Sequence, residues 1–253
     1  MTRVCIAGIT GWTGRAIAAA VDAAGDLQLV SGVSQSAARE EGVYATVAEA
    51  LVAAPADVLV DFTSAEAVKG NVDVALAAGV AVVVGTSGLS AGDYAEIDVH
   101  AQRVGVGVIA AGNFSLLAAL LMRSATEIAR HVRSWEIVDY ASAEKPDVPS
   151  GTSRELAERL AGVRRPALGH PLETLHGPVE ARGATVAGSQ IHSVRLPSFV
   201  VSTEIVFGAP GERLVLRHDP NESPEPYVAG TLYAVRAVRD RVGLTRGLDA
   251  LLA

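Results

Sequence analysis

The sequence is poor in several residue types, and each shortage narrows what the protein can be. Cys5 is its only cysteine, which excludes an internal disulfide framework and a cysteine-ligated metal site; it lies in an apolar run, where we expect it to be buried. Only 21 residues are basic against 28 acidic ones, too few for a surface that binds nucleic-acid phosphates. We therefore expect a small-molecule partner, no nucleic acid, and a reducing cytoplasmic compartment.

Metal-ligand clusters, a signal peptide and clean membrane spans are missing too. His, Asp and Glu do not gather at metal-ligand spacing, so we expect no metal. The N-terminus lacks a signal-peptide pattern. Residues 104–122 are uncharged for 19 residues, formally enough to span a membrane, but Gly112, Asn113 and Ser115 interrupt them. A buried strand, loop and helix is the better interpretation, and we expect no membrane partner.

What is present is a pattern typical of an α/β fold. With 49% hydrophobic and 19% charged residues, the chain is able to bury a large core. In its first part, short Val/Ile runs alternate with helical patterns. The runs are residues 3–8, 27–33, 57–63, 80–88 and 105–113, and the helical patterns are residues 15–25, 47–54, 65–78 and 92–102. Strands buried on both faces and separated by helices predict a Rossmann-type, doubly wound parallel sheet.

The second part of the chain has a different texture. After a helix predicted at residues 115–130, longer segments with partial alternation and hairpin-like turns predict an α+β domain with a mixed sheet. These segments are residues 135–142, 189–199, 200–209 and 212–219. Residues 163–188 are predicted to form a mobile surface loop, and residues 227–253 a helical tail on the first domain. We place the first domain at residues 1–114 and 219–253, and the second at residues 115–218.

The segment "GITGWTG" predicts that the first domain binds a dinucleotide. It lies between the first strand and the first helix, where Gly8 permits a tight turn, Gly11 lets the backbone approach a pyrophosphate, and Gly14 allows close packing of helix on sheet. Trp12 and Thr13 lie in the first turn of that helix, whose N–H groups face the phosphates. The alternative is a turn that is only structural.

The end of the second strand indicates which dinucleotide binds. An acidic residue there holds the ribose hydroxyls of NAD, whereas small polar and basic residues accept the additional phosphate of NADP. Here Ser34 and Ser36 place no carboxylate at that point, and Arg39 is positioned to pair with the phosphate. We therefore predict NADPH, with NADH possible, because Glu40 and Glu41 lie close by.

Polar and small residues after the next strands are predicted to line the cofactor groove. They lie at the carboxyl edge of the sheet, where ligands of such folds bind. These residues are Phe62, Thr63, Gly85, Thr86 and Ser87, followed by Gly112, Asn113 and Phe114 at the crossing into the second domain. For the last group a hinge capped by Asn113 and Ser115 is the alternative.

A second candidate site follows in "EKPDVPSGTSREL". Its turn brings Ser150, Gly151 and Thr152 to the start of a helix, where hydroxyls and unpaired N–H groups suit a carboxylate; a plain helix cap is the alternative. Lys145 precedes this turn and is one of two lysines in an arginine-rich chain, the other being Lys69. A lysine retained here suggests a need for a compact ammonium group.

These motifs together resemble the dihydrodipicolinate reductase family, which reduces a cyclic unsaturated dicarboxylate of lysine biosynthesis with a nicotinamide cofactor. The resemblance runs almost from end to end, and its last two stretches are similar to actinobacterial members especially. It rests on "GITGWTG", "DFTSAEAVKGN", "VVVGTSGLS", "AGNFS", "EKPDVPSGT", "ARG", "IHSVRLPSFVVSTEIVFGAPGERLVLRHD" and "GLTRGLDALL". It implies that the second domain binds substrate and forms a homotetramer through its sheet.

The resemblance also reveals a departure. Where the family has paired histidines, the first its proposed proton donor, this chain has Ala141 and Ser142, and the family's glycine after "NFS" is Leu117. By similarity, Lys145 serves as acid and substrate ligand, and the Ser-Gly-Thr turn binds a carboxylate. Tyr140 and a water held by Ser142 are the other candidates to supply the proton.

Three hypotheses follow. The first is an NADPH-dependent reductase of a cyclic imino or enamino carboxylate, whose substrate need not be the lysine-pathway intermediate of the family. The second is an authentic dihydrodipicolinate reductase that uses Lys145. The third is a non-catalytic dinucleotide-binding paralogue, suggested by Ala141 and Ser142.

Overall fold

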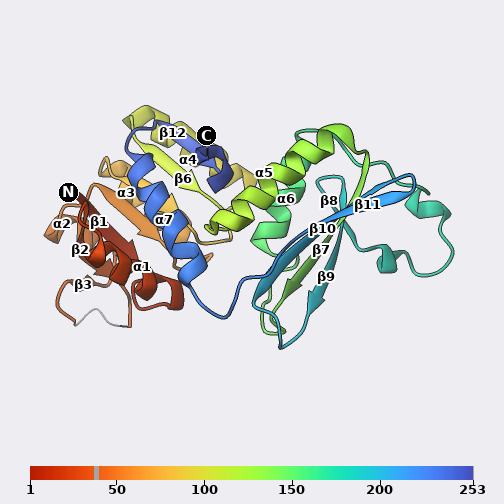
Figure 1. The fold of residues 1–253 in the computed structure, drawn as a ribbon. Helices are drawn as coiled ribbons and strands as arrows, with labels where there is room; N and C mark the ends of the chain where they lie inside the picture. The colour runs from red at the N-terminus through yellow and green to blue at the C-terminus, as the bar shows by residue number, and fades with distance from the viewer. Residues whose placement is uncertain (37–39, 253) are drawn as a thin grey trace. The chain divides into compact units, whose positions relative to one another are not determined.

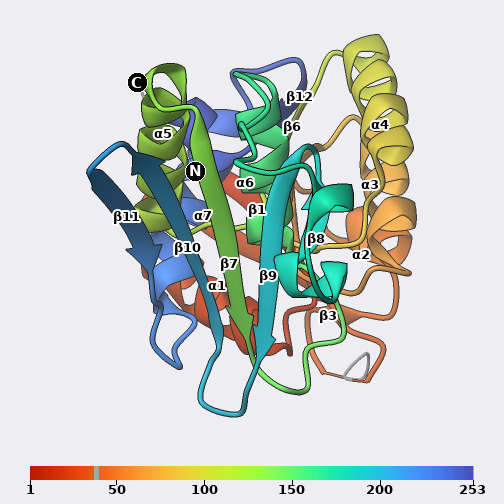
Figure 2. The ribbon, with the colours of Figure 1, turned by 90° about the vertical axis from the view of Figure 1, so that its right-hand side faces the viewer.

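The chain folds into two compact units. The computed structural model describes residues 1–36 and 40–252. The first unit comprises Met1–Leu116 and Pro224–Ala253, and the second comprises Leu117–Ser223 (Figures 1 and 2). Each unit has its own sheet and its own hydrophobic core.

The first unit is built on a seven-stranded sheet in which all neighbouring strands run parallel, in the order β12-β6-β5-β4-β1-β2-β3. The predicted doubly wound sheet is therefore confirmed. Its strands are β1 (Thr2–Ala7), β2 (Leu27–Val33), β3 (Val43–Tyr44), β4 (Val58–Asp61), β5 (Ala81–Val84), β6 (Gly107–Ala110) and β12 (Gly243–Arg246).

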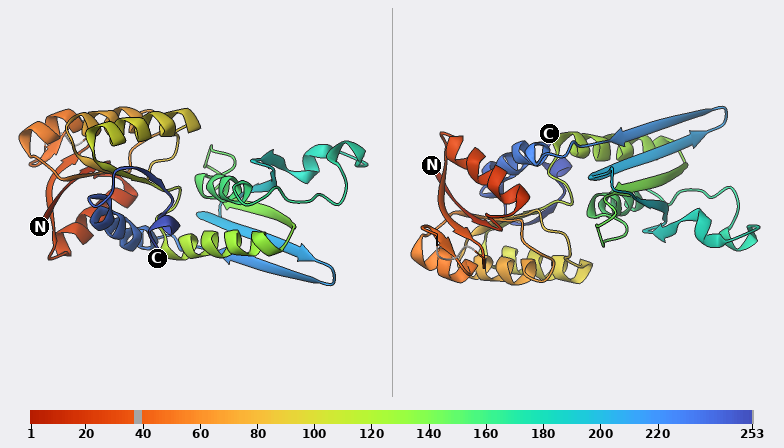
Figure 3. Two further views of the ribbon diagram at one scale, coloured as in Figure 1. Left: turned by 90° about the horizontal axis from the view of Figure 1, so that it is seen from above. Right: turned by 90° about the horizontal axis from the view of Figure 1, so that it is seen from below.

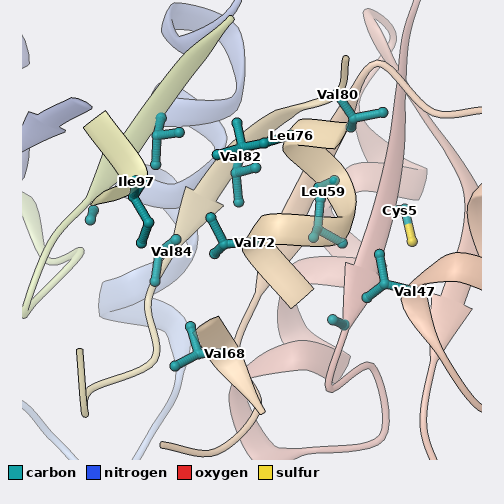
Figure 4. Close-up of a cluster of buried hydrophobic side chains, with 14 of the residues drawn as sticks. Cys5, Val47, Leu59, Val68, Val72, Leu76, Val80, Val82, Val84 and Ile97 are labelled. Atoms are coloured by element: carbon teal, nitrogen blue, oxygen red, sulfur yellow. The ribbon is translucent and has the colours of Figure 1, made fainter. Parts of the chain in front are cut away.

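Helices cover both faces of this sheet, as Figure 3 shows. Helices α1 (Trp12–Ala23) and α7 (Glu225–Val238) pack on one face, and α2 (Val47–Ala53), α3 (Val68–Ala77) and α4 (Ala91–Val104) on the other. Val, Leu and Ile side chains of α2 to α4 fill the space against the strands (Figure 4). Because both faces are covered, the central strands are continuous apolar runs.

The predicted helical tail is wrong in its second half. Helix α7 ends at Val238, and residues 243–246 form β12, which pairs in parallel with β6 and adds a seventh strand to the sheet. The strand begins at Gly243, whose φ of +81° breaks the helical path. A strand of four residues at a sheet edge is too short to show a period of two in the sequence.

The second unit has a mixed five-stranded sheet in the order β11-β10-β7-β9-β8, in which only the β7 and β9 pair is parallel. Helices α5 (Leu116–His131) and α6 (Gly151–Ala161) supply the rest of this unit's core, with Trp135, Ile137 and Phe207 from the sheet. The strands are β7 (Ser134–Ala141), β8 (Ala184–Val186), β9 (Ser189–Arg195), β10 (Val201–Ala209) and β11 (Glu212–His218).

Two segments differ from simple sequence expectations. Residues 163–188 were predicted to be a loop, but they contain two short 3-10 helices, Leu172–Thr174 and Val179–Arg182, and the strand β8. The uncharged stretch that begins at residue 104 is divided between the end of α4, β6 and the start of α5. Among the described residues, no helix is both long and apolar enough to cross a membrane.

Two helical glycines provide a test of this packing. A Cβ added at Gly230 in α7 would lie 1.9 Å from the Phe114 carbonyl oxygen, whereas one at Gly70 in α3 would meet nothing within 4 Å. We expect Gly230→Ala to lower the free energy of unfolding by about 1–3 kcal/mol because backbone must move. The matched Gly70→Ala should raise it by about 0.5–1 kcal/mol. Urea denaturation measures both, and equal effects would contradict the packing.

Candidate active site

The glycines of the loop between β1 and α1 have different roles. A Cβ at Gly8, whose φ is +82°, would lie 2.2 Å from the Phe62 carbonyl oxygen, and one at Gly14 would lie 2.1 Å from that of Gly8. Packing alone therefore requires glycine at both positions. A Cβ at Gly11 would meet only the Gly8 oxygen, at 3.1 Å, so the space beside Gly11 is open. This opening is where a pyrophosphate fits against backbone.

Helix α1 begins at this opening. Trp12 and Thr13 form its first turn, which carries no acidic residue, so its N–H groups and the helix dipole suit an anion. The Trp12 ring is 52% exposed and meets Tyr227 edge-on, with ring centroids 6.1 Å apart. Both side chains belong to the first unit, and the indole flanks the start of the helix.

The residues after β2 form a small hydroxyl cluster. Ser34 Oγ lies 2.8 Å from Thr10 Oγ1 and 3.1 Å from Ser36 Oγ. Ser34 thus joins the end of β2 to the phosphate-binding loop without placing a carboxylate there. Arg39, predicted to pair with a phosphate, lies outside the described residues.

The predicted groove residues Thr63 and Thr86 direct their hydroxyls at a carboxylate that sequence reasoning missed. Asp61 is fully buried at the end of β4. Its Oδ1 accepts hydrogen bonds from Thr63 Oγ1 at 2.8 Å and Thr86 Oγ1 at 2.6 Å, and its Oδ2 accepts one from Asn71 at 2.8 Å. Through Asp61, these hydroxyls connect the loop after β4 to the loop after β5. Because both hydroxyls donate to Asp61, we expect any cofactor contact from Thr63 or Thr86 to involve other atoms of these residues.

Phe62 and Phe114 meet edge-to-face, with ring centroids 5.9 Å apart. Phe114 is only 1% exposed, so its ring is a packing group. A Cβ at Gly85 would lie 2.2 Å from the Phe62 ring, which explains the glycine. Asn113 Oδ1 accepts the Ser115 N–H at 2.8 Å, the capping arrangement that sequence analysis left as an alternative. Ser87 and Gly112 are exposed.

In the second unit, the Pro-Ser-Gly-Thr turn leads into α6. Ser150 is the N-cap residue, and its hydroxyl accepts the Ser153 N–H at 3.4 Å. Its own N–H and hydroxyl donate to Asp139, at 3.1 and 2.5 Å. The predicted carboxylate contact from Ser150 is therefore replaced by a structural role. Gly151 and Thr152 form the first turn of α6.

Lys145 lies in the loop that connects β7 to α6. Its Nζ is 2.8 Å from Asp147 Oδ1; the side chain is 28% exposed, and the ammonium has three N–H donors in all. The Lys145 N–H donates to the Ser142 carbonyl oxygen at 3.0 Å, and Ser142 Oγ accepts the Glu144 N–H at 3.4 Å. Ser142 therefore shapes the turn that presents Lys145.

Tyr140 is on the wrong face of β7 to act with these groups. Successive residues of a strand point to opposite faces, and Asp139 and Ala141 face the buried side that bears α6, both at 0% exposure. Tyr140 points the other way, where its ring packs on Phe199 and under the Arg217 guanidinium. As a proton donor to a ligand at α6, Tyr140 is set aside.

Comparisons with known proteins agree with this architecture over its whole length. Family models described as dihydrodipicolinate reductase, N-terminus, and dihydrodipicolinate reductase, C-terminus, match residues 2–114 and 116–252. The 4-hydroxy-tetrahydrodipicolinate reductase of Cutibacterium acnes is 38% identical over 255 residues, covering 100% of this chain and 99% of the relative. That of Desulfitobacterium hafniense is 37% identical over 271 residues, covering 99% and 98%.

Solved structures show the same similarity. Dipicolinate-bound dihydrodipicolinate reductase from Paenisporosarcina sp. TG-14 superposes with a TM-score of 0.78 at 28% identity, covering 99% of both chains. GenD2 from gentamicin A biosynthesis, solved in complex with NAD, has a TM-score of 0.68 at 18% identity and covers 99% of this chain and 90% of its own. At that identity GenD2 supports the fold alone.

Proposed function

The chain belongs to the dihydrodipicolinate reductase family, and on that premise we propose that it reduces 4-hydroxy-tetrahydrodipicolinate with hydride from NADPH. That the protein is a nicotinamide-dependent oxidoreductase follows from the family. We infer the substrate from two relatives named 4-hydroxy-tetrahydrodipicolinate reductase, which are 37–38% identical to this chain over nearly their whole length. Among the hypotheses from sequence, this match favours the authentic family reaction over a different substrate.

The observation that carries the proposal is an ammonium in the loop that leads into a helix N-terminus. Lys145 lies in the loop between β7 and α6, and Gly151 and Thr152 begin the helix that follows. Both features bind carboxylates, one as a charge and the other through N–H groups. A dicarboxylate offers a group for each, and a structural neighbour is described as binding dipicolinate, which is a dicarboxylate.

The hydroxyl of 4-hydroxy-tetrahydrodipicolinate must leave as water to give the double bond that is reduced. A bound nicotinamide would supply the hydride to one end of that double bond, and the protein must supply a proton to the other end. Lys145 is the candidate for that proton, since Tyr140 faces the other side of its strand. A water held by Ser142 is the second candidate. Positioned general acids contribute about 10²–10⁴-fold to rate. Ala141 is fully buried, so it offers no access for a solvent proton.

Removal of Lys145 tests this assignment. We expect Lys145→Ala to lower kcat/KM for 4-hydroxy-tetrahydrodipicolinate by about 10²-fold or more, because both a substrate charge and an acid are lost. The loss of NADPH absorbance measures the rate of turnover. KM for NADPH should stay constant.

The chain provides a matched control. Lys69 is the other lysine; it pairs with Asp73 at 2.7 Å on the surface of α3. Lys69→Ala should leave turnover unchanged. Equal activity of the Lys145→Ala and wild-type proteins would refute the role of Lys145. A wild-type protein that binds NADPH tightly but oxidises none would instead indicate the non-catalytic paralogue.

NADPH is preferred over NADH in this proposal. The hydroxyl cluster of Ser34, Ser36 and Thr10 at the end of β2 accepts a phosphate, whereas a carboxylate there would repel it. Arg39, outside the described residues, is proposed to pair with that phosphate.

Two substitutions separate the cofactors. We expect Ser34→Asp to raise KM for NADPH about tenfold or more, because like charges about 4 Å apart repel by about 1–4 kcal/mol. KM for NADH should change much less, and Ser34→Ala controls for loss of the hydroxyl. Arg39→Ala should likewise weaken NADPH more than NADH. Steady-state kinetics with both cofactors measures this, and equal effects on the two would count against the phosphate assignment.

We also propose that the second unit mediates assembly into the homotetramer implied by family resemblance. The sheet face opposite α5 and α6 carries Val138, Val206 and Val215; Val206 is in register with Val215, which is 43% exposed. A cavity of about 510 Å³ on this face is lined partly by Val138, Val206 and the Glu136 carboxylate, which bonds to Arg182 and His192. A sheet face that presents apolar side chains beside a polar cluster is typical of an interface.

Light scattering on the eluting protein tests the assembly. We expect the mass of four chains for the wild type and a smaller species for Val206→Asp, because a charge would be buried between copies. Val99→Asp, at an exposed valine of α4 in the first unit, is the matched control and should remain tetrameric. A wild-type monomer at micromolar concentration would overturn the proposal.

A further inference from the structure

The Asp139 carboxylate joins the elements that carry the proposed substrate site. It is fully buried on β7 and accepts five hydrogen bonds from side chains and backbone. Three come from the start of α6: the N–H and hydroxyl of Ser150 and the hydroxyl of Ser153 at 3.0 Å. Two come from β9: the hydroxyl of Ser193 at 3.1 Å and Arg195 Nη2 at 2.8 Å.

Arg195 extends this connection to the loop that bears Lys145. The same Nη2 atom that contacts Asp139 lies 2.7 Å from the Asp147 carbonyl oxygen. Asp147 in turn pairs with Lys145 through its carboxylate. The loop is thus fastened to Asp139 at two points, directly at Ser150 and through Arg195 at Asp147.

The ionised state of Asp139 makes these connections strong. Burial opposes ionisation of this carboxyl, but the hydrogen bonds from Ser150 and Arg195 outweigh it and hold the Asp139 pKa below its usual value. A buried carboxylate that loses a partner is strongly destabilised. The donors are therefore held in place, and the loop between them has little freedom to move.

We propose that Asp139 and Arg195 are positioning residues that fix the Lys145 ammonium relative to the first turn of α6, and so match the spacing of the two carboxylates of the substrate. The inference rests on the proposed function. Fixed spacing matters because a misplacement of about 1 Å in a positioning contact costs about 10²-fold in rate. A merely structural role would instead affect folding without discriminating between substrate and cofactor.

Arg195→Lys is the decisive variant. A lysine keeps the positive charge beside Asp139 but lacks the planar guanidinium that reaches Asp139 and the Asp147 carbonyl together. We expect KM for the substrate to rise about tenfold and KM for NADPH to stay constant. The melting temperature should fall, because the buried Asp139 carboxylate keeps its charge but loses part of its pairing. Asp139→Asn, which removes the charge at constant size, should show the same split between the two KM values. An unchanged substrate KM in a folded Arg195→Lys protein would overturn the proposal.

Two further variants serve as controls. Arg236→Lys makes the same exchange at a bidentate pair with Asp26 in the first unit, and should change neither KM. When Lys145 is already replaced by alanine, Arg195→Lys should raise KM for the substrate little further, because its effect acts through Lys145. The same tenfold cost in both backgrounds would contradict action through Lys145.

Failure of the proposed function is recognisable separately. If the wild type oxidises no NADPH with the substrate, the proposed reaction fails, and calorimetric binding of dipicolinate then tests positioning alone. Weaker dipicolinate binding by about tenfold in Arg195→Lys would still support the positioning role. Equal binding by the wild-type and Arg195→Lys proteins would overturn it.

Discussion

The bond between the Asp139 carboxylate and Arg195 sets the shape of the loop on which the proposed chemistry depends. Without it, a fully buried charge on β7 would lose one of its two connections to the loop between β7 and α6. Because the cost of an unpaired buried carboxylate is high, strand, loop and helix must keep their mutual arrangement. In the proposed arrangement Lys145 gains a fixed place relative to the first turn of α6, whose Ser153 hydroxyl donates to Asp139.

The first unit also contains a buried aspartate that accepts hydrogen bonds from neighbouring loops. Asp61 is also fully buried near the carboxyl end of a strand, and it gathers the hydroxyls of Thr63 and Thr86 from two neighbouring loops. In both units, hydroxyls that resemble ligand contacts in the sequence are occupied by a buried aspartate. The proposed ligand contacts are therefore made by other groups, among them the Lys145 ammonium and the open space beside Gly11.

Much of this was predictable from sequence because its signals are local. The continuous Val/Ile runs of β1, β4 and β5 and the three glycines after β1 predict the parallel sheet and its phosphate-binding loop, and both the sheet and the nicotinamide cofactor are confirmed. Strand β12 was missed because a strand of four residues is too short to show the alternation of apolar and polar residues that predicts a strand. The role of Asp139 was missed because Arg195 lies 56 positions away in the sequence. The side of β7 that Tyr140 faces could not be read from the sequence, because it depends on which residues of the strand are buried.

The central claim is that the family reaction proceeds on a site with Ala141 and Ser142 where the family has histidines. In the proposed function, Lys145, held by the Asp139 network, is the group that provides charge and proton, and a bound nicotinamide would provide the hydride. Incubation of the protein with 4-hydroxy-tetrahydrodipicolinate and NADPH deuterated at its transferable position tests this most directly, with the product examined by mass spectrometry. The account predicts that the reduced product gains one deuterium per NADPH oxidised. An unlabelled, unreduced substrate recovered from protein that demonstrably binds NADPH would contradict it.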